Sequence, residues 1–255
     1  MTVSRPATGN GPRYELAESC PAQARARAAL NQTRFDRQGE QEDSGFPTLP
    51  VLEVRDLRTA ILKPASFALS MGECIAIRGP SGAGKTLLLR TVADLDPNAG
   101  SVILEDRNRS TIPGPEWRRL VGYVPAEPGW WAETVGEHFA DRPAAAVFLN
   151  NLGFSDETGT WPISRLSTGE RLRLALVRAL IMRPKVLLLD EPTAALDTAS
   201  VAAVESLIAA ERRSGLAVLW VTHDPSQARR IADRQLVMEA GCLRAEEELC
   251  TATSL

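Results

Sequence analysis

Short runs of consecutive apolar residues mark the predicted strands of this chain. Residues 186–189 and 217–221 each form such a run, and residues 73–78 contain one between Glu73 and Arg78; all three are bounded by polar or glycine-containing segments. A continuous apolar run is expected of a parallel strand that is covered by helices on both faces. The pattern therefore predicts several buried strands in a domain of the α/β class.

Helical segments alternate with these strands. Residues 85–93 follow a glycine-rich turn and read as a helix, and residues 170–182 are apolar-rich and free of proline. The second segment contains several arginines and stops before Pro184, which is a typical helix end. Strand–helix alternation resumes over residues 186–241. This order predicts a sheet with a parallel or mixed core.

The two ends of the chain differ from its centre. Residues 1–47 are rich in glycine, proline and glutamine, carry balanced charges and show no hydrophobic period, so we expect disorder there. They also lack the apolar segment of a signal peptide. Residues 246–255 read as a solvated tail. We therefore assign one domain to residues 48–245, with a small helical subdomain at about residues 126–182.

Composition narrows the class of protein further. The chain has 255 residues, of which 44% are hydrophobic, enough for one sizeable core. A net charge of −3 without a basic stripe argues against nucleic-acid binding. No apolar run is long enough to cross a bilayer, so any membrane-spanning part would belong to another chain. The scattered cysteines suit a reducing cytoplasm and show no metal spacing; they are Cys20, Cys74, Cys242 and Cys250.

A glycine-rich turn joins the strand at residues 73–78 to the helix that follows. Such a turn points successive backbone N–H groups at one spot, where the positive end of the helix dipole also lies. With the full GxxxxGK[ST] spacing between a strand and a helix, the turn predicts a nucleoside triphosphate site rather than a plain loop. Lys85 would reach the β- and γ-phosphates, and the Thr86 hydroxyl would take a place on Mg²⁺. The loop consists of Gly79, Pro80, Ser81, Gly82, Ala83, Gly84, Lys85 and Thr86.

Three further segments carry candidate chemistry. Asp190 and Glu191 end the apolar run at 186–189, and His223 follows the run at 217–221. Leu166–Glu170 stands at the start of the predicted helix, about twenty residues before the acidic pair. Taken alone, each segment has a plain interpretation: a solvated acidic turn, a loop histidine and a helix-capping sequence. Their order along the chain is what makes them informative.

In this order, the phosphate loop and the three segments resemble the ATP-binding subunits of ABC transporters, over roughly residues 49–245. Leu166–Glu170 is similar to the family signature LSGGQ, with Thr168 and Glu170 as departures. Residues 192–197 resemble the family's run into its D-loop. The resemblance implies a P-loop nucleotide-binding domain of the ABC type that binds ATP and Mg²⁺.

The resemblance also implies a role for each candidate residue. Asp190 would hold Mg²⁺ through water, Glu191 would polarise the attacking water, and His223 would contact the γ-phosphate. Ser167 and the Gly169 amide would touch the γ-phosphate that a second copy of the chain holds in its own loop. Two copies, or this chain and a paired ABC subunit, would therefore enclose ATP as a head-to-tail dimer.

Beyond the signature, the chain departs from the family at two places. The glutamine expected after Pro125 is Ala126, and the neighbouring Glu127 would point elsewhere in an extended segment. The aromatic residue that usually stacks on adenine is absent from residues 57–62, where Arg58 reads as solvated, so base selectivity would be poor.

Trp130 and Trp131 stand where the family's helical subdomain meets its permease. Because adjacent residues do not share a face, we expect one buried and one exposed tryptophan, or two in the core.

The sequence favours an ATP-hydrolysing subunit that dimerises on ATP and drives a separate membrane permease from the cytoplasmic face of the cell membrane. A soluble ABC ATPase of DNA repair or translation would need a second cassette or a long coiled coil, and neither is present. A degenerate, nucleotide-sensing subunit with little hydrolysis stays open because of Ala126 and the missing aromatic. A narrower similarity links the chain to small bacterial ATPases of iron or metal export. We interpret His138 as structural.

Overall fold

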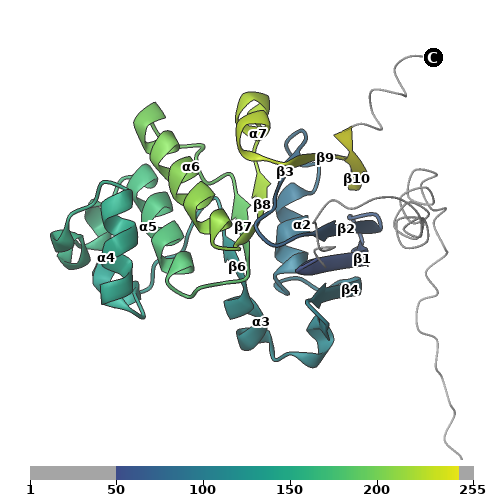
Figure 1. The fold of residues 1–255 in the computed structure, drawn as a ribbon, viewed down its shortest axis with the longest axis horizontal. Helices are drawn as coiled ribbons and strands as arrows, with labels where there is room; N and C mark the ends of the chain where they lie inside the picture. The colour runs from purple at the N-terminus through teal and green to yellow at the C-terminus, as the bar shows by residue number, and fades with distance from the viewer. Residues whose placement is uncertain (1–49, 247–255) are drawn as a thin grey trace, which may run out of the picture. The chain divides into compact units, whose positions relative to one another are not determined.

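The computed structural model describes residues 50–246, which contain two sheets (Figure 1). The larger sheet has the strand order β10-β9-β3-β8-β7-β6, and all neighbours are parallel except β9 and β10. The predicted mixed, largely parallel core is therefore confirmed. The strands of this sheet are β3 (Cys74–Arg78), β6 (Val121–Val124), β7 (Val186–Asp190), β8 (Ala217–Val221), β9 (Arg234–Glu239) and β10 (Cys242–Ala245).

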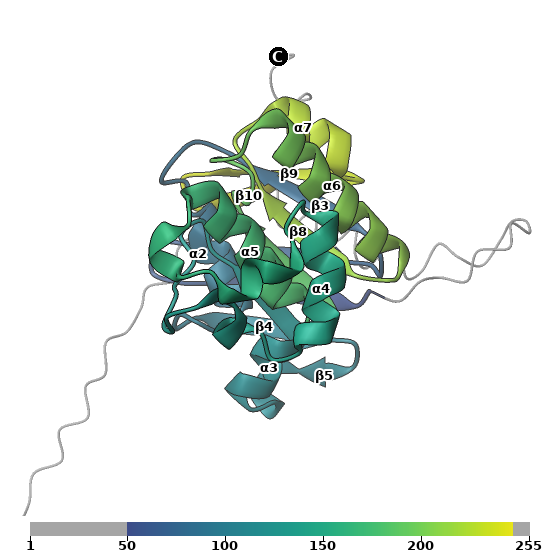
Figure 2. The same cartoon turned by 90° about the vertical axis from the view of Figure 1, so that its left-hand side faces the viewer.

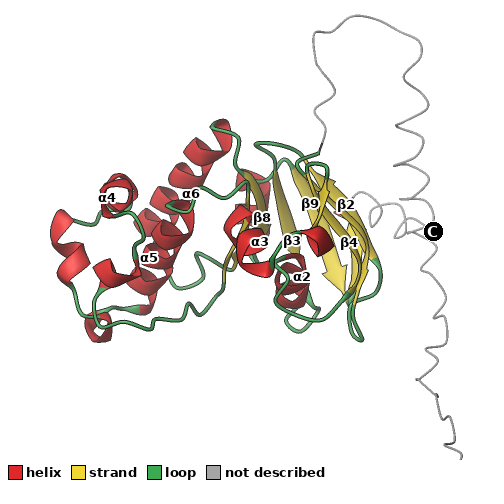
Figure 3. Ribbon diagram, turned by 90° about the horizontal axis from the view of Figure 1, so that it is seen from below, coloured by secondary structure: helices red, strands yellow, loops and turns green. Residues whose placement is uncertain are grey.

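The smaller sheet is antiparallel and has the strand order β2-β1-β4-β5. It lies on the side of the larger sheet away from the main helical layer (Figure 3). Its strands are β1 (Leu52–Arg58), β2 (Ala65–Leu69), β4 (Ala99–Leu104) and β5 (Arg107–Asn108).

Four of the α-helices lie on the two sides of the larger sheet. Helices α4, α5 and α6 gather on one side of the larger sheet, whereas α2 lies toward the smaller sheet (Figures 2 and 3). None of the helices within residues 50–246 is both long and apolar enough to cross a membrane. The helices are α2 (Lys85–Val92), α3 (Gly114–Leu120), α4 (Arg142–Asn151), α5 (Thr168–Leu180), α6 (Thr198–Arg213) and α7 (Pro225–Ile231).

The continuous apolar runs arise because the larger sheet separates two hydrophobic cores. On β8, Leu219 and Val221 pack with α2 and the smaller sheet, whereas Val218 and Trp220 pack with the layer of α4, α5 and α6. All five residues of β8 are buried, so this strand has no solvated face. Burial of both faces stabilises the sheet through apolar surface removed from water.

The structure corrects two predictions, one for the start of a helix and one for the tail. Helix α5 begins at Thr168 rather than at residue 170, because Ser167 caps it. In the expected solvated tail, Glu246 forms an ion pair with Arg78, so this carboxylate is not simply solvated. The expectation of disorder at residues 1–47, and the cysteines at positions 20 and 250, lie outside the described residues.

Candidate functional site

The eight residues of the predicted phosphate loop form the turn between β3 and α2 and the first positions of α2. Gly79, Gly82 and Gly84 have φ angles of 147°, 76° and 106°, a region that favours glycine. At Gly79 an added Cβ would lie 2.0 Å from the carbonyl oxygen of Met238 on β9, so the close approach of the two strands requires glycine. The loop is thus fixed by tertiary contact as well as by its own conformation.

Lys85 is the first residue of α2, and its side chain folds back over the turn. The residue is 8% exposed, and Nζ donates hydrogen bonds to the carbonyl oxygens of Gly79 (2.8 Å) and Pro80 (2.9 Å). These partners are neutral main-chain atoms, so the positive charge is not neutralised by them. An anionic ligand at this place would gain charge-assisted hydrogen bonds from the ammonium group.

Asp190 ends β7 and lies beside the start of α2. It is 3% exposed and accepts a hydrogen bond from the Tyr123 hydroxyl over 3.2 Å, and the neighbouring Thr86 hydroxyl stabilises its charged form. Burial raises the pKa of Asp190 above the ordinary carboxyl value, although the bonds from Thr86 and Tyr123 act to lower it. A carboxylate and a hydroxyl in contact are hard oxygen donors of the kind that Mg²⁺ prefers, so the pair fits that ion.

Tyr123 was not predicted as a site residue. It lies on β6, which pairs in parallel with β7 and places Tyr123 opposite Leu188, two residues before Asp190. Burial and the neighbouring Asp190 charge raise the pKa of the Tyr123 phenol, so it stays protonated and donates. No local sequence signal marks this contact, because it depends on the pairing of strands that are far apart along the chain.

Glu191 and His223 meet at the ends of neighbouring strands. Nδ1 of His223 lies 2.5 Å from Oε2 of Glu191, although the residues are 32 positions apart. Glu191 has a φ of 51°, which is uncommon for a non-glycine residue and is a frequent feature of functional sites. Its backbone N–H donates to the Val221 carbonyl over 3.1 Å, which ties the turn to β8. The structure thus brings the two candidate catalytic side chains into direct contact.

The signature segment caps α5. The Ser167 hydroxyl accepts a hydrogen bond from the Glu170 N–H (3.2 Å), and the Glu170 carboxylate accepts from the Ser167 N–H and hydroxyl (2.8 Å each). The departure at position 170 is compatible with this capping box, since glutamate, like glutamine, supports the helix start. The backbone bond from Ser167 holds the pKa of Glu170 below its ordinary value.

The signature stands apart from the other candidate residues. An added Cβ at Gly169 would lie 3.0 Å from Leu196 Cδ2, so this glycine packs against the segment that follows the acidic pair. Within residues 50–246, no hydrogen bond or ion pair joins Ser167 or Gly169 to the phosphate loop. Glu191 and His223 contact each other, Asp190 lies beside the start of α2, and the signature shares no hydrogen bond with any of these residues in the described part of the chain.

Residues 57–62, which lack the expected aromatic residue, lie beside the phosphate loop. Gly241 connects the two, because its N–H donates to the Ala83 carbonyl and its own carbonyl accepts from the Lys63 N–H, both over 2.9 Å. Between β1 and β2 the side chain of Ile61 is 69% exposed. An exposed aliphatic side chain thus occupies the region where an aromatic was expected.

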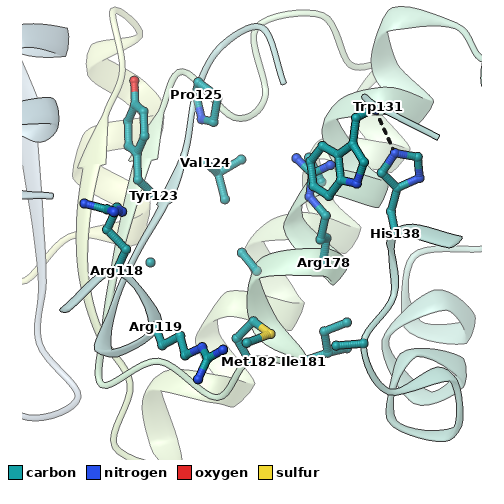
Figure 4. A pocket seen from close by; sticks show the side chains of 14 residues that line it. Arg118, Arg119, Tyr123, Val124, Pro125, Trp131, His138, Arg178, Ile181 and Met182 are labelled. Carbon is teal, nitrogen blue, oxygen red and sulfur yellow. Dashed lines mark hydrogen bonds between the residues drawn. The ribbon is translucent and has the colours of Figure 1, made fainter. Parts of the chain in front are cut away.

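A pocket of about 360 Å³ separates β6 from the helical layer (Figure 4). Trp131 lines it with 73% of its surface exposed, whereas Trp130 is half-buried against the helical core. The expectation of one buried and one exposed tryptophan is closer to this arrangement than that of two core residues. Ala126 and Glu127 are both exposed just ahead of this region.

His138 has the structural role that we expected. It is 6% exposed, and its Nε2 accepts hydrogen bonds from the backbone N–H groups of Trp131 (3.0 Å) and Ala132 (3.1 Å). Nδ1 lies 2.9 Å from the Thr134 carbonyl, so this nitrogen carries the proton. The ring therefore fixes the loop that carries the exposed tryptophan.

Comparison with known proteins gives the same class as the fold and the site. The family described as ABC transporter matches residues 62–194. An aliphatic sulfonates import ATP-binding protein of Paracoccus denitrificans is 36% identical over 74% of this chain and 76% of its own length. A probable iron export ATP-binding protein of Escherichia coli is 37% identical over 70% of this chain and 84% of its own length.

Solved structures agree in fold. One described as an ATP-binding subunit of an ABC transporter has a TM-score of 0.69 at 23% identity, covering 80% of this chain and 94% of that one. A subunit from Clostridium perfringens described as part of an ABC transporter complex has a TM-score of 0.65 at 24% identity, covering 80% and 92%.

The chain belongs to the ABC transporter family. Within that family it is an ATP-binding subunit that couples ATP hydrolysis to transport. Its relatives include an import protein and an export protein at similar identity, so sequence identity does not favour metal exporters over importers.

Proposed function

We propose that this subunit hydrolyses Mg²⁺–ATP at the edge of the larger sheet where the phosphate loop, β7 and β8 end. The observation that carries the proposal is the meeting of Thr86 with Asp190 and of Glu191 with His223 at that edge. Thr86 and Asp190 would hold Mg²⁺, which supplies positive charge to the phosphate oxygens when it is bound. Lys85 would bind the terminal phosphates.

In this proposal, Glu191 orients and polarises the attacking water, and His223 supports it. The Nδ1–H of His223 donates to the Glu191 carboxylate, which limits the rotation of that side chain. His223 is 68% exposed and so is accessible to the γ-phosphate on its other side. Most of the rate enhancement of phosphoryl transfer comes from positioning and charge stabilisation of this kind.

The site is completed by a second copy of the chain. Ser167 and Gly169 stand apart from the phosphate loop of their own chain, so a head-to-tail homodimer would supply them from the partner.

The subunit would lie on the cytoplasmic face of the cell membrane and drive a separate permease. The pocket beside Trp131 supports such an attachment, because an exposed tryptophan is a frequent interface anchor.

Phosphate release by the purified protein tests the hydrolysis. Turnover of ATP is expected with Mg²⁺ and should disappear when the metal is chelated. An Asp190→Asn variant should need a higher Mg²⁺ concentration for half-maximal turnover, because it loses a charged oxygen donor. Equal turnover with and without Mg²⁺ would contradict the assignment of Thr86 and Asp190.

The Ala126→Gln variant is expected to turn over ATP faster than the native chain. Ala126 offers no amide to the metal or the attacking water, and one added hydrogen bond would lower the barrier by about 1 kcal/mol, or roughly fivefold in rate. Steady-state phosphate release measures this change. Ala132→Gln is the matched control, since it adds the same amide to the loop past the tryptophan pair. A gain of equal size in the control would show that the effect is not specific to position 126.

Nucleotide selectivity is expected to be low. The exposed Ile61 offers an aliphatic surface, without base-specific hydrogen bonds. Titration calorimetry should therefore give affinities for ATP and GTP within about threefold of each other, and Ile61→Tyr should tighten both by roughly tenfold, since base stacking stabilises binding by about 1–3 kcal/mol. Met71→Tyr, at another exposed apolar position, is the control and should change neither. A strong native preference for ATP would refute this interpretation.

A further inference from the structure

A buried glutamine connects the segments that follow Glu191 and His223. Gln227 lies on α7, four residues after His223, and it is 3% exposed. Its Nε2 donates to the hydroxyl of Thr193 over 2.9 Å, and its Oε1 lies 3.1 Å from the same hydroxyl. Thr193 stands two residues after Glu191, in the turn that carries this carboxylate. One side chain thus joins two segments that are 34 residues apart.

The glutamine is fixed from its other side by α6. Its Nε2 also donates to Oε1 of Glu205 over 2.9 Å, and Arg230 donates to both oxygens of Glu205 over 2.7 Å each. Burial acts to raise the pKa of Glu205, but the hydrogen bonds from Arg230 and Gln227 outweigh it and hold the pKa below the ordinary value. The group therefore stays ionised, and the amide is held in one orientation between a hydroxyl and a carboxylate.

Glu191 and His223 need such a connection. They belong to different turns, at the ends of β7 and β8, and their contact of 2.5 Å depends on the relative position of the two turns. Glu191 has a left-handed backbone, with a φ of 51°, which persists only when surrounding contacts determine it. The backbone bond from Glu191 to Val221 fixes the start of the turn, and Thr193 offers the next fixed point.

We propose that Gln227 is a positioning residue for ATP hydrolysis. Through Thr193 on one side and Glu205 on the other, it locks the turn of Glu191 against the helix that follows His223. The two candidate catalytic side chains then keep their contact. Gln227 itself does not bind the nucleotide. The expected effect of Gln227 on ATP turnover rests on the proposed function. Its expected effect on the contact between Glu191 and His223 does not.

The kinetic test uses the full chain with Gln227→Leu. We expect kcat for ATP to fall about tenfold while the Kd for ATP, measured by calorimetry, stays within about twofold, because no phosphate-binding residue contacts the amide. Thr193→Val removes the same hydrogen bond from the other side and should give a similar loss. The double variant should lose little more, since both changes break one connection. Gln235→Leu, which replaces a partly buried glutamine on β9, is the matched control and should keep full turnover.

The geometric test uses the ring signals of histidine in NMR spectra. The chain has only two histidines, so His138 serves as an internal reference for His223. Gln227→Leu should move the His223 signals and leave those of His138 in place. Unchanged His223 signals in both Gln227→Leu and Thr193→Val would overturn the inference, as would an unchanged kcat in both. A native protein without turnover, together with shifted His223 signals, would refute the proposed function but would still support the connection from Gln227 to the turn of Glu191.

Discussion

Glu191→Gln protein is expected to bind Mg²⁺–ATP normally and to hydrolyse it about 1,000-fold more slowly than the native chain. The amide keeps the shape of the side chain but removes the charge that polarises water, and loss of such a group costs roughly 10²–10⁴ in rate. Binding should persist because Lys85, Thr86 and Asp190 are unchanged. Single-turnover phosphate release and calorimetry measure the two effects. Native turnover in the variant would remove Glu191 from the reaction.

The same variant also tests the dimer. With hydrolysis blocked, ATP should stay enclosed, so light scattering should find a dimer with ATP and a monomer with ADP. Adding Ser167→Arg should abolish the dimer, because a bulky side chain would occupy the place of the partner's γ-phosphate. Glu170→Ala is the control, since it disrupts the same capping box without adding bulk. A Glu191→Gln protein that stays monomeric in saturating ATP, also in membranes containing its permease, would count against the homodimer.

Lys85→Ala protein is expected to lose ATP affinity by at least about 100-fold. The ammonium group is held at the turn by two carbonyl oxygens, within reach of an anion bound by the loop. Charge-assisted hydrogen bonds contribute about 1.5–3 kcal/mol each, so loss of two of them accounts for a change of this size. Titration calorimetry measures it directly.

The control for this variant is Lys185→Ala. Lys185 is a surface residue whose Nζ pairs with Glu105 over 2.5 Å, and such exposed pairs contribute little. The control should keep native affinity and native folding, as judged by circular dichroism. If Lys85→Ala bound ATP as tightly as this control, the phosphate-loop assignment would be wrong.

The strands and the main helices of the site were predictable because their patterns are local. The run at residues 186–189 is apolar on both faces, and the structure explains it by the two cores on either side of β7. The start of α5 was placed two residues late, although Ser167 and Glu170 have the Ser-x-x-Glu spacing of a capping box, which marks Ser167 as the N-cap. The glycine-rich turn between β3 and α2 was predictable for the same reason, as its residues are consecutive.

The contacts between distant segments were not predictable from the sequence. The Tyr123 hydroxyl reaches Asp190 only because β6 and β7 are neighbours in the sheet. Gln227 reaches Thr193 only because α7 returns over the turn that follows β7. Neither residue belongs to a spaced motif, so only the three-dimensional arrangement reveals them.

Strand β8 has a consequence for how this domain tolerates change. Because its alternate residues belong to different cores, a substitution on one face of β8 weakens the packing against one layer, and a substitution on the other face weakens the packing against the other. The helical layer is therefore not a detachable module: without it, Val218 and Trp220 would be left facing water. Sequence drift in the sheet is expected to concentrate on its outer strands, β6 and β10, where one neighbour rather than two constrains each position.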